Sequence, residues 1–269
     1  MSNAALRIVS AVVGIPLVVG LTYLGGWYFA VFVVLIGVLA QDEVYALFRA
    51  ANVQPFRWVG LAAGVLVMIA PVWPAAQPLA VLTLVGLLAA SPFLAHGAPI
   101  LPRISATVAG MLYPALLLSY GVALRAGVDG ALTEAQAFEL TIATLVLIWS
   151  TDSFAYFAGR ALGKHPLAPR VSPKKTWEGS VGGALGTLLL VVLAKLFWLT
   201  WLTWTDVAAL AVICGALSQL GDLAESAFKR SVGVKDSGNV LPGHGGMLDR
   251  NDALLLVLPL IVLYVQYLR

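Results

Sequence analysis

Long apolar segments recur along almost the whole chain, and they restrict what it can fold into. Each segment has roughly the 17 to 25 residues that an α-helix needs to cross a bilayer. Their approximate ranges are 6–24, 27–48, 57–73, 78–95, 104–124, 138–158, 180–200, 204–224 and 250–268. Because 60% of the residues are hydrophobic and only 11% are charged, an ordinary soluble globule is excluded. We therefore predict an all-α, polytopic integral membrane protein with about nine transmembrane helices.

Three of these segments carry signals that compete with a membrane helix. Proline residues interrupt the third and fourth segments, which are the weakest of the set: Pro71, Pro74, Pro78 and Pro92. In the first segment Arg7 precedes an apolar run, which is the arrangement of a secretory signal peptide. However, no small-x-small cleavage site in a polar context comes after the run. We interpret it as an uncleaved helix.

Positive residues are distributed unequally between the loops. Of the 16 Lys and Arg residues, only Arg125, Lys195 and Arg269 fall outside if the N-terminus is cytoplasmic. Cytoplasmic loops carry the excess of Lys and Arg in membrane proteins. We therefore expect a cytoplasmic N-terminus, an odd number of helices, and a loop at 125–137 on the outer side.

The two parts of the chain differ in chemical character. Residues 1–125 hold about five of the expected helices, which we interpret as a scaffold. Their only acidic residues are Asp42 and Glu43, for which we favour a position at the membrane interface beside Arg49 and Arg57. Residues 138–269 hold the remaining helices and two clusters of charge. We expect the catalytic site in this second part.

The first cluster, from Gly221 to Asp252, is a polar stretch between two apolar segments. Its side chains at i, i+3, i+4 and i+7 share one helix face if the preceding helix continues through them: Asp222, Glu225, Ser226 and Lys229. Asp249 and Asp252 repeat the i, i+3 spacing where the next apolar helix begins. Two helix ends can thus present acidic faces to each other at a membrane boundary.

The second cluster begins at Asp152, within an apolar segment. A charge there costs roughly 2.5 to 3.5 kcal/mol by insertion scales, so such residues are functional by default. The alternatives are a helix–helix hydrogen bond or a pair with Arg160. Five basic residues follow it, together with Ser172 and Thr176: Arg160, Lys164, Arg170, Lys174 and Lys175. This loop suits a polyphosphate, or alternatively anchors the chain to anionic lipid.

Carboxylates and cations gathered at one membrane face favour a divalent cation. Asp152, Asp222, Asp249 and Asp252 would together cost on the order of 10 kcal/mol if left unpaired. Mg²⁺ prefers one or two carboxylates plus phosphate oxygens, and a second ion would provide a two-metal site. One Cys and three His exclude a zinc site. A net charge of +3 is too small to indicate nucleic-acid binding.

Small residues recur at the start of the seventh apolar segment. Gly179, Gly182, Gly183 and Gly186 form two overlapping small-xxx-small patterns. Such patterns allow helices to approach closely. The contact they predict lies either within the subunit or across a homodimer.

The run from Ser226 to Asp252 resembles the hallmark of the phosphatidate cytidylyltransferase family, also called CDP-diacylglycerol synthases. The positions that carry the resemblance are Ser226, Phe228, Lys229, Arg230, Lys235, Asp236, Gly238, Leu241, Pro242, His244, Gly245, Gly246, Met247, Asp249, Arg250 and Asp252. The stretch from Asp152 to Gly179 is similar to a second characteristic segment of the family. Asn251 departs from it, since the family usually has an apolar residue or Thr there. The first half matches in general character only.

The resemblance implies a Mg²⁺-dependent reaction in a bacterial inner membrane, with the site facing the cytoplasm. CTP and phosphatidic acid give CDP-diacylglycerol and pyrophosphate. It implies Asp222 and Asp249 as principal metal ligands, with Asp152 and Asp252 completing or supporting the shell. The catalytic set is Asp152, Asp222, Asp249, Asp252, Lys229 and Arg250. The substrate-binding set is Ser172, Lys174, Lys175, Thr176, Arg230, Lys235, Asp236, His244, Gly245 and Gly246. His244 either bonds a phosphate or holds the loop.

Two other functions fit parts of this pattern. A CTP-dependent lipid-alcohol kinase would have a similar build but would transfer the γ-phosphoryl group and release CDP. A transporter would place its charges near the bilayer midplane between repeated halves. Here the charges collect at one face, and no internal repeat is visible.

Overall fold

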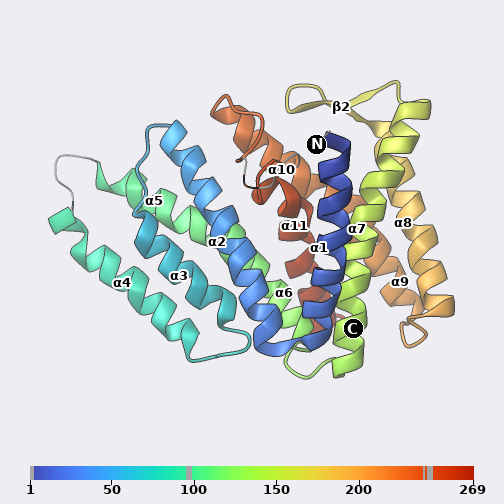
Figure 1. Ribbon diagram of the computed structural model, residues 1–269, viewed down its shortest axis with the longest axis horizontal. Helices are drawn as coiled ribbons and strands as arrows, with labels where there is room; N and C mark the ends of the chain where they lie inside the picture. The colour runs from blue at the N-terminus through green and yellow to red at the C-terminus, as the bar shows by residue number, and fades with distance from the viewer. Residues whose placement is uncertain (1–2, 95–98, 239, 241–244) are drawn as a thin grey trace.

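The fold is built from helices. The computed structural model (Figure 1) describes residues 3–94, 99–238, 240 and 245–269, with side chains from residue 12 onward. The elements are α1 (Asn3–Leu24), α2 (Gly26–Ala50), α3 (Arg57–Ile69), α4 (Ala76–Leu94), α5 (Ile100–Gly110), η1 (Met111–Leu116), α6 (Leu117–Arg125), α7 (Glu134–Leu162), β1 (Pro166–Ala168), β2 (Ser172–Thr176), α8 (Trp177–Phe197), α9 (Trp204–Leu210), η2 (Ala211–Leu217), α10 (Ser218–Ser231) and α11 (Leu248–Tyr267). The prediction of an all-α protein is confirmed, apart from one two-stranded hairpin for which the sequence shows no recognisable strand pattern.

Every apolar segment of the sequence coincides with a described helix or with a run of joined helices. Six of these are long and apolar enough to cross a membrane: α2, α4, α5 to α6 through η1, α7, α8, and α9 to α10 through η2. The part of α1 whose side chains are described, Val12–Leu24, and the whole of α3 are also apolar, but each is shorter. The chain is a polytopic integral membrane protein. Nine crossings and a cytoplasmic N-terminus stay predictions.

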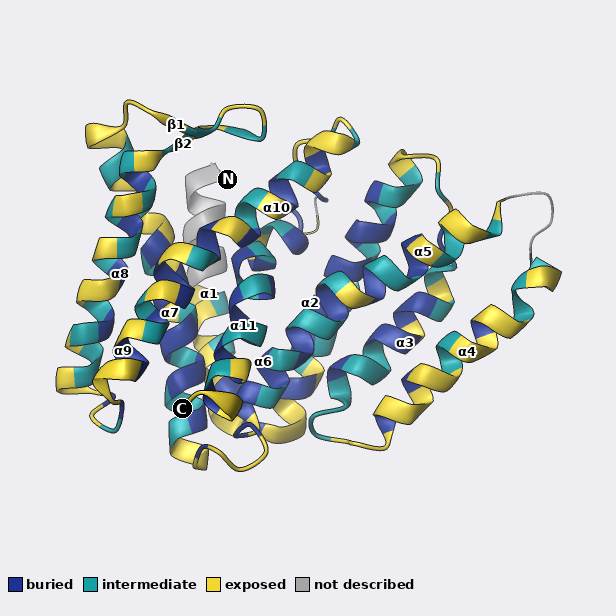
Figure 2. Ribbon diagram, turned by 180° about the vertical axis from the view of Figure 1, so that it is seen from behind, coloured by how far each residue is buried: buried dark blue, intermediate teal, exposed yellow. Residues whose placement is uncertain are grey.

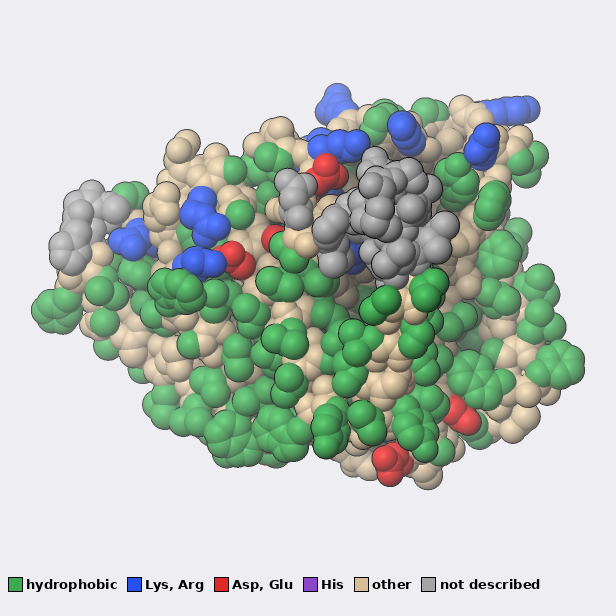
Figure 3. Space-filling view, in the orientation of Figure 1, with side chains coloured by type: hydrophobic (Ala, Val, Ile, Leu, Met, Phe, Trp, Pro, Cys, Tyr) green, Lys and Arg blue, Asp and Glu red, His purple; other side chains and the backbone are tan. Residues whose placement is uncertain are grey.

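The two ends of the bundle differ. In Figure 1 the β1–β2 hairpin and the segment after α10 lie at one end, and the loop between α6 and α7 lies at the other. The start of α1 and the C-terminus also lie at opposite ends (Figure 1). On the face in Figure 3, Lys and Arg gather along the hairpin end, and hydrophobic side chains cover most of the remainder. We call the hairpin end the charged end.

The core lies at the centre of the bundle. Figure 2 shows buried residues concentrated on α2, α6, α7 and α11, whereas α4 is largely exposed. Side chains such as Leu124, Leu255 and Ile261 are almost completely buried there. Outward-facing helices keep an apolar surface because their surroundings are lipid.

Two of the long helices contain a π-helical segment, η1 and η2. Pro114 lies within η1, and its missing N–H removes one bond of the regular helical pattern. In η2 the carbonyl of Cys214 accepts from Thr151 Oγ1 at 3.0 Å and from Ser218 Oγ at 2.5 Å. These hydroxyls satisfy a backbone group that would otherwise be buried without a partner.

Glycines at the start of α8 allow it to pack closely against α7. A Cβ on Gly179 would lie 2.8 Å from the carbonyl oxygen of Ala155, and one on Gly183 would lie 3.0 Å from Ala155 Cβ. A Cβ on Gly186 would overlap the ring of Phe154. The small-residue pattern therefore serves packing within the chain, and it gives no independent support to a homodimer.

This packing predicts a loss of stability for Gly183→Leu. Its side chain would enter the space of Ala155 and the backbone of Thr151, and overpacking of this kind costs about 1–3 kcal/mol. The measurement is the thermal midpoint for loss of the monodisperse peak in detergent. Gly86→Leu is the control, because a Cβ on Gly86 of α4 meets nothing within 4 Å. Equal midpoints for the two variants would contradict the packing assignment.

Candidate active site

Three carboxylates from three helices meet at the charged end. Asp152 lies on α7, Asp222 on α10 and Asp252 on α11. They are close enough for the charge of Asp222 to act on both Asp152 and Asp252, and for the charge of Asp152 to act on Asp252. We call these three residues the carboxylate cluster. It confirms that the two charged stretches of the sequence converge in space.

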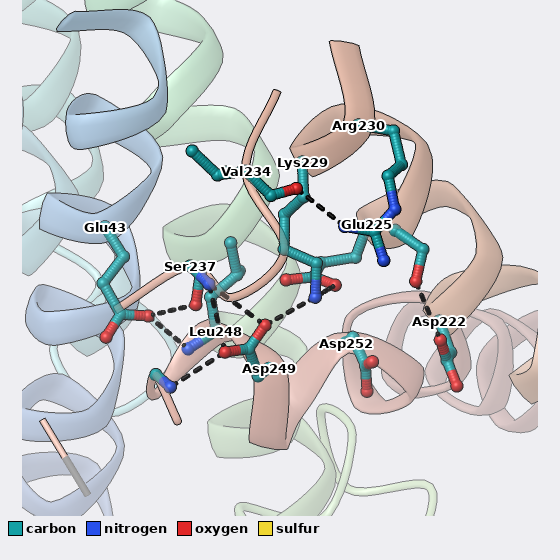
Figure 4. Close-up of polar contacts among 12 residues, drawn as sticks. Glu43, Asp222, Glu225, Lys229, Arg230, Val234, Ser237, Leu248, Asp249 and Asp252 are labelled. Carbon is teal, nitrogen blue, oxygen red and sulfur yellow. Dashed lines mark hydrogen bonds and ion pairs between the residues drawn. The ribbon is translucent and has the colours of Figure 1, made fainter. Parts of the chain in front are cut away.

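Close packing of α10 against α11 contributes to this convergence. A Cβ on Gly221 would lie 2.6 Å from the carbonyl oxygen of Asp252 and 3.1 Å from Ala253 Cα. Only glycine permits this approach. Because Asp222 follows Gly221 directly, the contact brings Asp222 and Asp252 to neighbouring positions on the two helices, as Figure 4 shows.

Lys175 connects the hairpin to the carboxylate cluster. Its Nζ lies 2.5 Å from Asp222 Oδ2. Ser226, one turn along α10, donates its hydroxyl to Asp222 Oδ1 at 3.3 Å. The charges of Lys175 and Arg250 also act on Asp152. Cations therefore lie beside the cluster, while the negative charges of its carboxylates repel one another.

The hairpin is held at the start of α8. Thr176 caps the helix by accepting from Gly179 N at 3.1 Å. Glu178 accepts from the backbone N of Lys164 at 3.1 Å and of His165 at 3.2 Å, and its other oxygen lies 2.5 Å from His165 Nδ1. These contacts fix the end of the hairpin where β1 begins and β2 ends. The sequence predicts only a basic loop here, because three- and five-residue strands give too short a pattern to recognise.

A second group of polar contacts, the Glu43–Asp249 network, lies beside the cluster. Asp249 accepts from Lys229 Nζ at 2.6 Å, from Ser237 N at 3.1 Å and from Gly246 N at 2.8 Å. Lys229 Nζ also lies 2.5 Å from Glu225 Oε2. Glu225 is fully buried, and Lys229 is nearly so. The predicted acidic and basic face of α10 is confirmed, since the helix continues through Ser231.

Glu43 joins this network from the first half of the chain. It accepts from Ser237 Oγ at 2.8 Å, from Met247 N at 2.9 Å and from Leu248 N at 2.7 Å. In Figure 4 its carboxylate, on α2, faces Ser237 and Leu248. It therefore binds the first amides of α11, where a negative charge also complements the helix dipole.

The expected place beside Arg49 and Arg57 holds for one acidic residue of α2 and not for the other. Asp42 lies 2.5 Å from Arg57 Nε and 4.0 Å from Arg49 Nη1, as predicted. For Glu43 the interpretation is wrong, because this side chain is buried and turned towards α11. The signal that could have found it is a carboxylate inside an apolar segment, the same signal that singles out Asp152.

Glycines let the segment before α11 approach these carboxylates. A Cβ on Gly238 would lie 2.5 Å from Glu43 Oε1, and one on Gly246 would lie 2.5 Å from Glu43 Oε2. Gly245 has a φ of 81°, and a Cβ there would lie 2.9 Å from Asp249 Oδ2. The sequence predicts that Gly245 and Gly246 allow close approach to a ligand. The structure shows close approach to protein carboxylates.

The remaining predicted residues lie around these two groups. Lys174 on β2 and Lys235, Asp236 and Arg250 are exposed, and Ser172 is half-buried. Arg230 donates to the carbonyl of Val234 at 2.7 Å. Arg160 donates to Tyr156 Oη at 3.1 Å, so the alternative of a pair with Asp152 is not found among the described residues. His244 lies outside the described residues.

The predicted metal ligands fall in two places. Asp152 and Asp222 lie in the carboxylate cluster, together with Asp252. Asp249 lies in the neighbouring network, where Lys229 and two backbone amides occupy its oxygens. Its role as a ligand stays a prediction. Among residues 3–94, 99–238, 240 and 245–269, no three His, Cys, Asp or Glu side chains are grouped tightly enough to hold a metal by themselves.

The fold and the site together define a polytopic membrane protein with carboxylates and cations gathered at one end. A model of the cytidylyltransferase family matches residues 5–268. A Synechocystis protein named phosphatidate cytidylyltransferase is 36% identical over 97% of this chain and 96% of its own length. A phosphatidate cytidylyltransferase of Brucella abortus is 35% identical over 98% of this chain and 94% of its own. One from Staphylococcus saprophyticus is 42% identical over 50% of this chain and 52% of its own.

The chain belongs to the cytidylyltransferase family and is a nucleotidyltransferase. The match begins at residue 5 and so includes the first half, where the sequence motifs alone show only general similarity. This extent agrees with the structure, in which Glu43 of the first half contacts the start of α11.

We expect Glu43→Gln to loosen Ser237 and the start of α11 at Met247 and Leu248. The change removes a buried charge that accepts three hydrogen bonds, and an unsatisfied buried partner costs about 1–3 kcal/mol. Hydrogen exchange followed by mass spectrometry should show faster exchange of the amides of Met247 and Leu248. The matched control is Asp42→Asn, which removes a half-exposed ion pair worth about 1 kcal/mol or less. Unchanged exchange in Glu43→Gln would show that the carboxylate does not hold this segment.

Proposed function

We propose that the chain is a phosphatidate cytidylyltransferase, which makes CDP-diacylglycerol and pyrophosphate from CTP and phosphatidic acid. The observation that carries the proposal is the contact of Lys175 with Asp222 at the charged end. It places a basic hairpin against a carboxylate cluster where a membrane bundle ends. A water-soluble polyphosphate and a membrane lipid can meet at such a place. The names of the relatives support the same reaction.

The reaction needs charge relief and alignment more than a strong base. A phosphate oxygen of the lipid attacks the α-phosphorus of CTP. The bond from that phosphorus to the oxygen bridging to the β-phosphate breaks, and pyrophosphate leaves with the electron pair. The attacking oxygen is already anionic near neutral pH. The protein must therefore reduce repulsion between two anions and stabilise the leaving group.

We assign the two basic groups to different phosphates. Ser172, Lys174, Lys175 and Thr176, on or beside the hairpin, would bind the phosphates of CTP. Arg230, Lys235, Asp236, Gly245 and Gly246, around the end of α10 and the start of α11, complete the proposed substrate site. His244 belongs to the proposed set from the sequence alone. Arg250 lies beside the carboxylate cluster and would bind the lipid phosphate. Lys229 is held by Glu225 and Asp249, so we assign it to the positioning of Asp249.

The carboxylate cluster fits Mg²⁺ in its donor chemistry. Its three side chains supply hard oxygen ligands from three helices, and the charge of Asp222 acts on the other two. Mg²⁺ sites take one or two carboxylates and complete their shell with water and substrate phosphates. Asp222 and Asp152 would hold such an ion together with substrate phosphates. Asp252 would support them, and Asp249 is a further proposed ligand for a second ion. Bound Mg²⁺ would supply positive charge to the phosphates.

We also propose that the charged end faces the cytoplasm of a bacterial inner membrane. The excess of Lys and Arg at this end supports that orientation. The relatives named above are bacterial. A cytoplasmic site would give the hairpin access to soluble nucleotide.

The fate of the nucleotide tests the proposed reaction. With purified protein, Mg²⁺ and CTP labelled on the α-phosphate, we expect label in a lipid product only when phosphatidic acid is present. Pyrophosphate should form in equal amount. A control reaction contains CTP labelled on the γ-phosphate and diacylglycerol as the lipid. Transfer of the γ-label to that lipid, with release of CDP, would instead identify a lipid-alcohol kinase.

Asp222→Asn tests the role of the carboxylate cluster. We expect turnover to fall on the order of 100-fold or more, as when a group that stabilises transition-state charge is removed, while the protein remains monodisperse in detergent. Asp129→Asn is the matched control, because Asp129 is exposed in the loop between α6 and α7 at the opposite end. Near-normal turnover of Asp222→Asn across a Mg²⁺ titration would remove Asp222 from the site.

A further inference from the structure

A network of buried hydroxyls lies next to the carboxylate cluster, on the side away from the charged end. Its members are Thr151 on α7, Thr187 on α8 and Ser218 at the start of α10. All three side chains are buried. Hydroxyls removed from water need partners within the chain, and their positions are then constrained by those partners. We call these three residues the hydroxyl network.

Thr151 makes contacts with two other elements. Its Oγ1 lies 2.5 Å from Oγ1 of Thr187 on α8 and 3.0 Å from the carbonyl oxygen of Cys214 in η2. By contrast, Thr144 on the same helix donates to the carbonyl of Leu140 at 2.8 Å, within α7. The hydroxyl of Thr151 therefore joins three segments of the bundle: α7, α8 and η2.

The carbonyl of Cys214 is the point where the network reaches α10. It accepts from Ser218 Oγ at 2.5 Å as well as from Thr151. Cys214 lies within the π-helical segment η2, and such segments are frequent at functional sites. A Cβ on the next residue, Gly215, would lie 3.2 Å from Ala184 Cα of α8. Contacts on both sides of this carbonyl thus set the distances from η2 to α7 and to α8.

The network is adjacent in sequence to two members of the carboxylate cluster. Asp152 follows Thr151 directly, and Asp222 lies four residues beyond Ser218, or roughly 6 Å along the helix. Because Thr151 and Ser218 both bond the Cys214 carbonyl, they hold α7 and the start of α10 together one turn from the carboxylates. Metal sites depend on supporting contacts of this kind, and losing one typically costs about 10- to 100-fold in metal affinity or activity.

We propose that Thr151 is a positioning residue, whose hydroxyl sets the spacing at which Asp152 and Asp222 can share one Mg²⁺ ion. The inference rests on the proposed function and adds to it a residue that touches neither metal nor substrate. The hydroxyl acts by joining α7 to α8 and η2. A side chain of the same shape without the hydroxyl would loosen that joint and weaken metal binding.

Thr151→Val removes the hydroxyl and keeps the shape of the side chain. Titration of the purified protein with Mn²⁺ alone, followed by the electron paramagnetic resonance signal of the free ion, gives a dissociation constant without turnover. We expect Thr151→Val to raise this constant about tenfold. Thr151→Ser keeps the hydroxyl and should stay within about twofold of the wild type.

The matched control is Thr22→Val. Thr22 is fully buried like Thr151, but its hydroxyl donates at 2.7 Å to the carbonyl of Val18 within its own helix, α1. It lies close to the end of α1 at Leu24, and in Figure 1 that end of the helix is opposite the hairpin. The Mn²⁺ dissociation constant of Thr22→Val should stay within about twofold of the wild type.

Three results would overturn the proposal. The first is a Mn²⁺ dissociation constant for Thr151→Val that equals the wild-type value. The second is a loss of affinity that Thr151→Ser shares, since packing of the methyl group would then be the cause. The third is the absence of saturable Mn²⁺ binding in the wild type, because the cluster would then hold no metal.

Ser218→Ala is the second variant, and it takes the place of Thr151→Val if that protein is not monodisperse in detergent. Ser218 bonds the same carbonyl, one turn before Asp222. Its loss should raise the Mn²⁺ dissociation constant about threefold or more. A wild-type value for this variant would then count against the positioning role.

Turnover separates this inference from the proposed function. With CTP and phosphatidic acid, we expect Thr151→Val to raise the Mg²⁺ concentration for half-maximal turnover about tenfold. A loss of folded protein would instead lower the maximal rate and leave that concentration unchanged. A wild-type protein that shows the expected Mn²⁺ pattern but converts no phosphatidic acid would contradict the proposed function and still support the role of Thr151.

Discussion

The carboxylate of Glu43 makes the contacts on which the charged end of this membrane bundle depends. It lies on α2 in the first half of the chain and accepts from Ser237, Met247 and Leu248 in the second. A charge buried in this way is tolerated only when donors surround it, and their geometry is then strongly constrained. Because these donors belong to the start of α11 and the segment before it, Glu43 fixes where that helix begins. The helix turn that these contacts hold carries Asp249, Arg250 and Asp252.

Close packing by small residues provides the second condition for the site. Gly221 brings α10 against α11, and Gly179 and Gly183 bring α8 against α7. Helices in lipid gain little from hydrophobic association, so close backbone approach and polar contacts determine which helices become neighbours. The result places carboxylates from α7, α10 and α11 in one cluster and sets the basic hairpin above it. Lys175 then pairs with Asp222.

The charged end joins two environments that the proposed reaction needs. The hairpin and the segment after α10 carry exposed cations, which suit a soluble nucleotide. An apolar cavity lies among α1, α2, α6, α7 and α11. Arg250 lies where these regions meet. The first half of the chain takes part in both, since Glu43 holds the start of α11 and residues of α1, α2 and α6 line the cavity.

The sequence by itself determined the class of fold, the positions of the apolar segments and the charged face from Asp222 to Lys229. Apolar length and helical periodicity are local properties, and the bilayer enforces them wherever a segment crosses it. Only the tertiary structure decided which charges became partners. Glu43 and Leu248 are 205 residues apart, and no local pattern relates them. Asp249 and Asp252 share one helical turn, yet their side chains enter different groups because different neighbours pack on each. The glycine pattern of α8 fitted a contact within the chain or between chains, and its packing against Ala155 and Phe154 decided for the former. Neighbour choice depends on shape and on the burial of charge across the whole bundle, and a single sequence does not contain those distances.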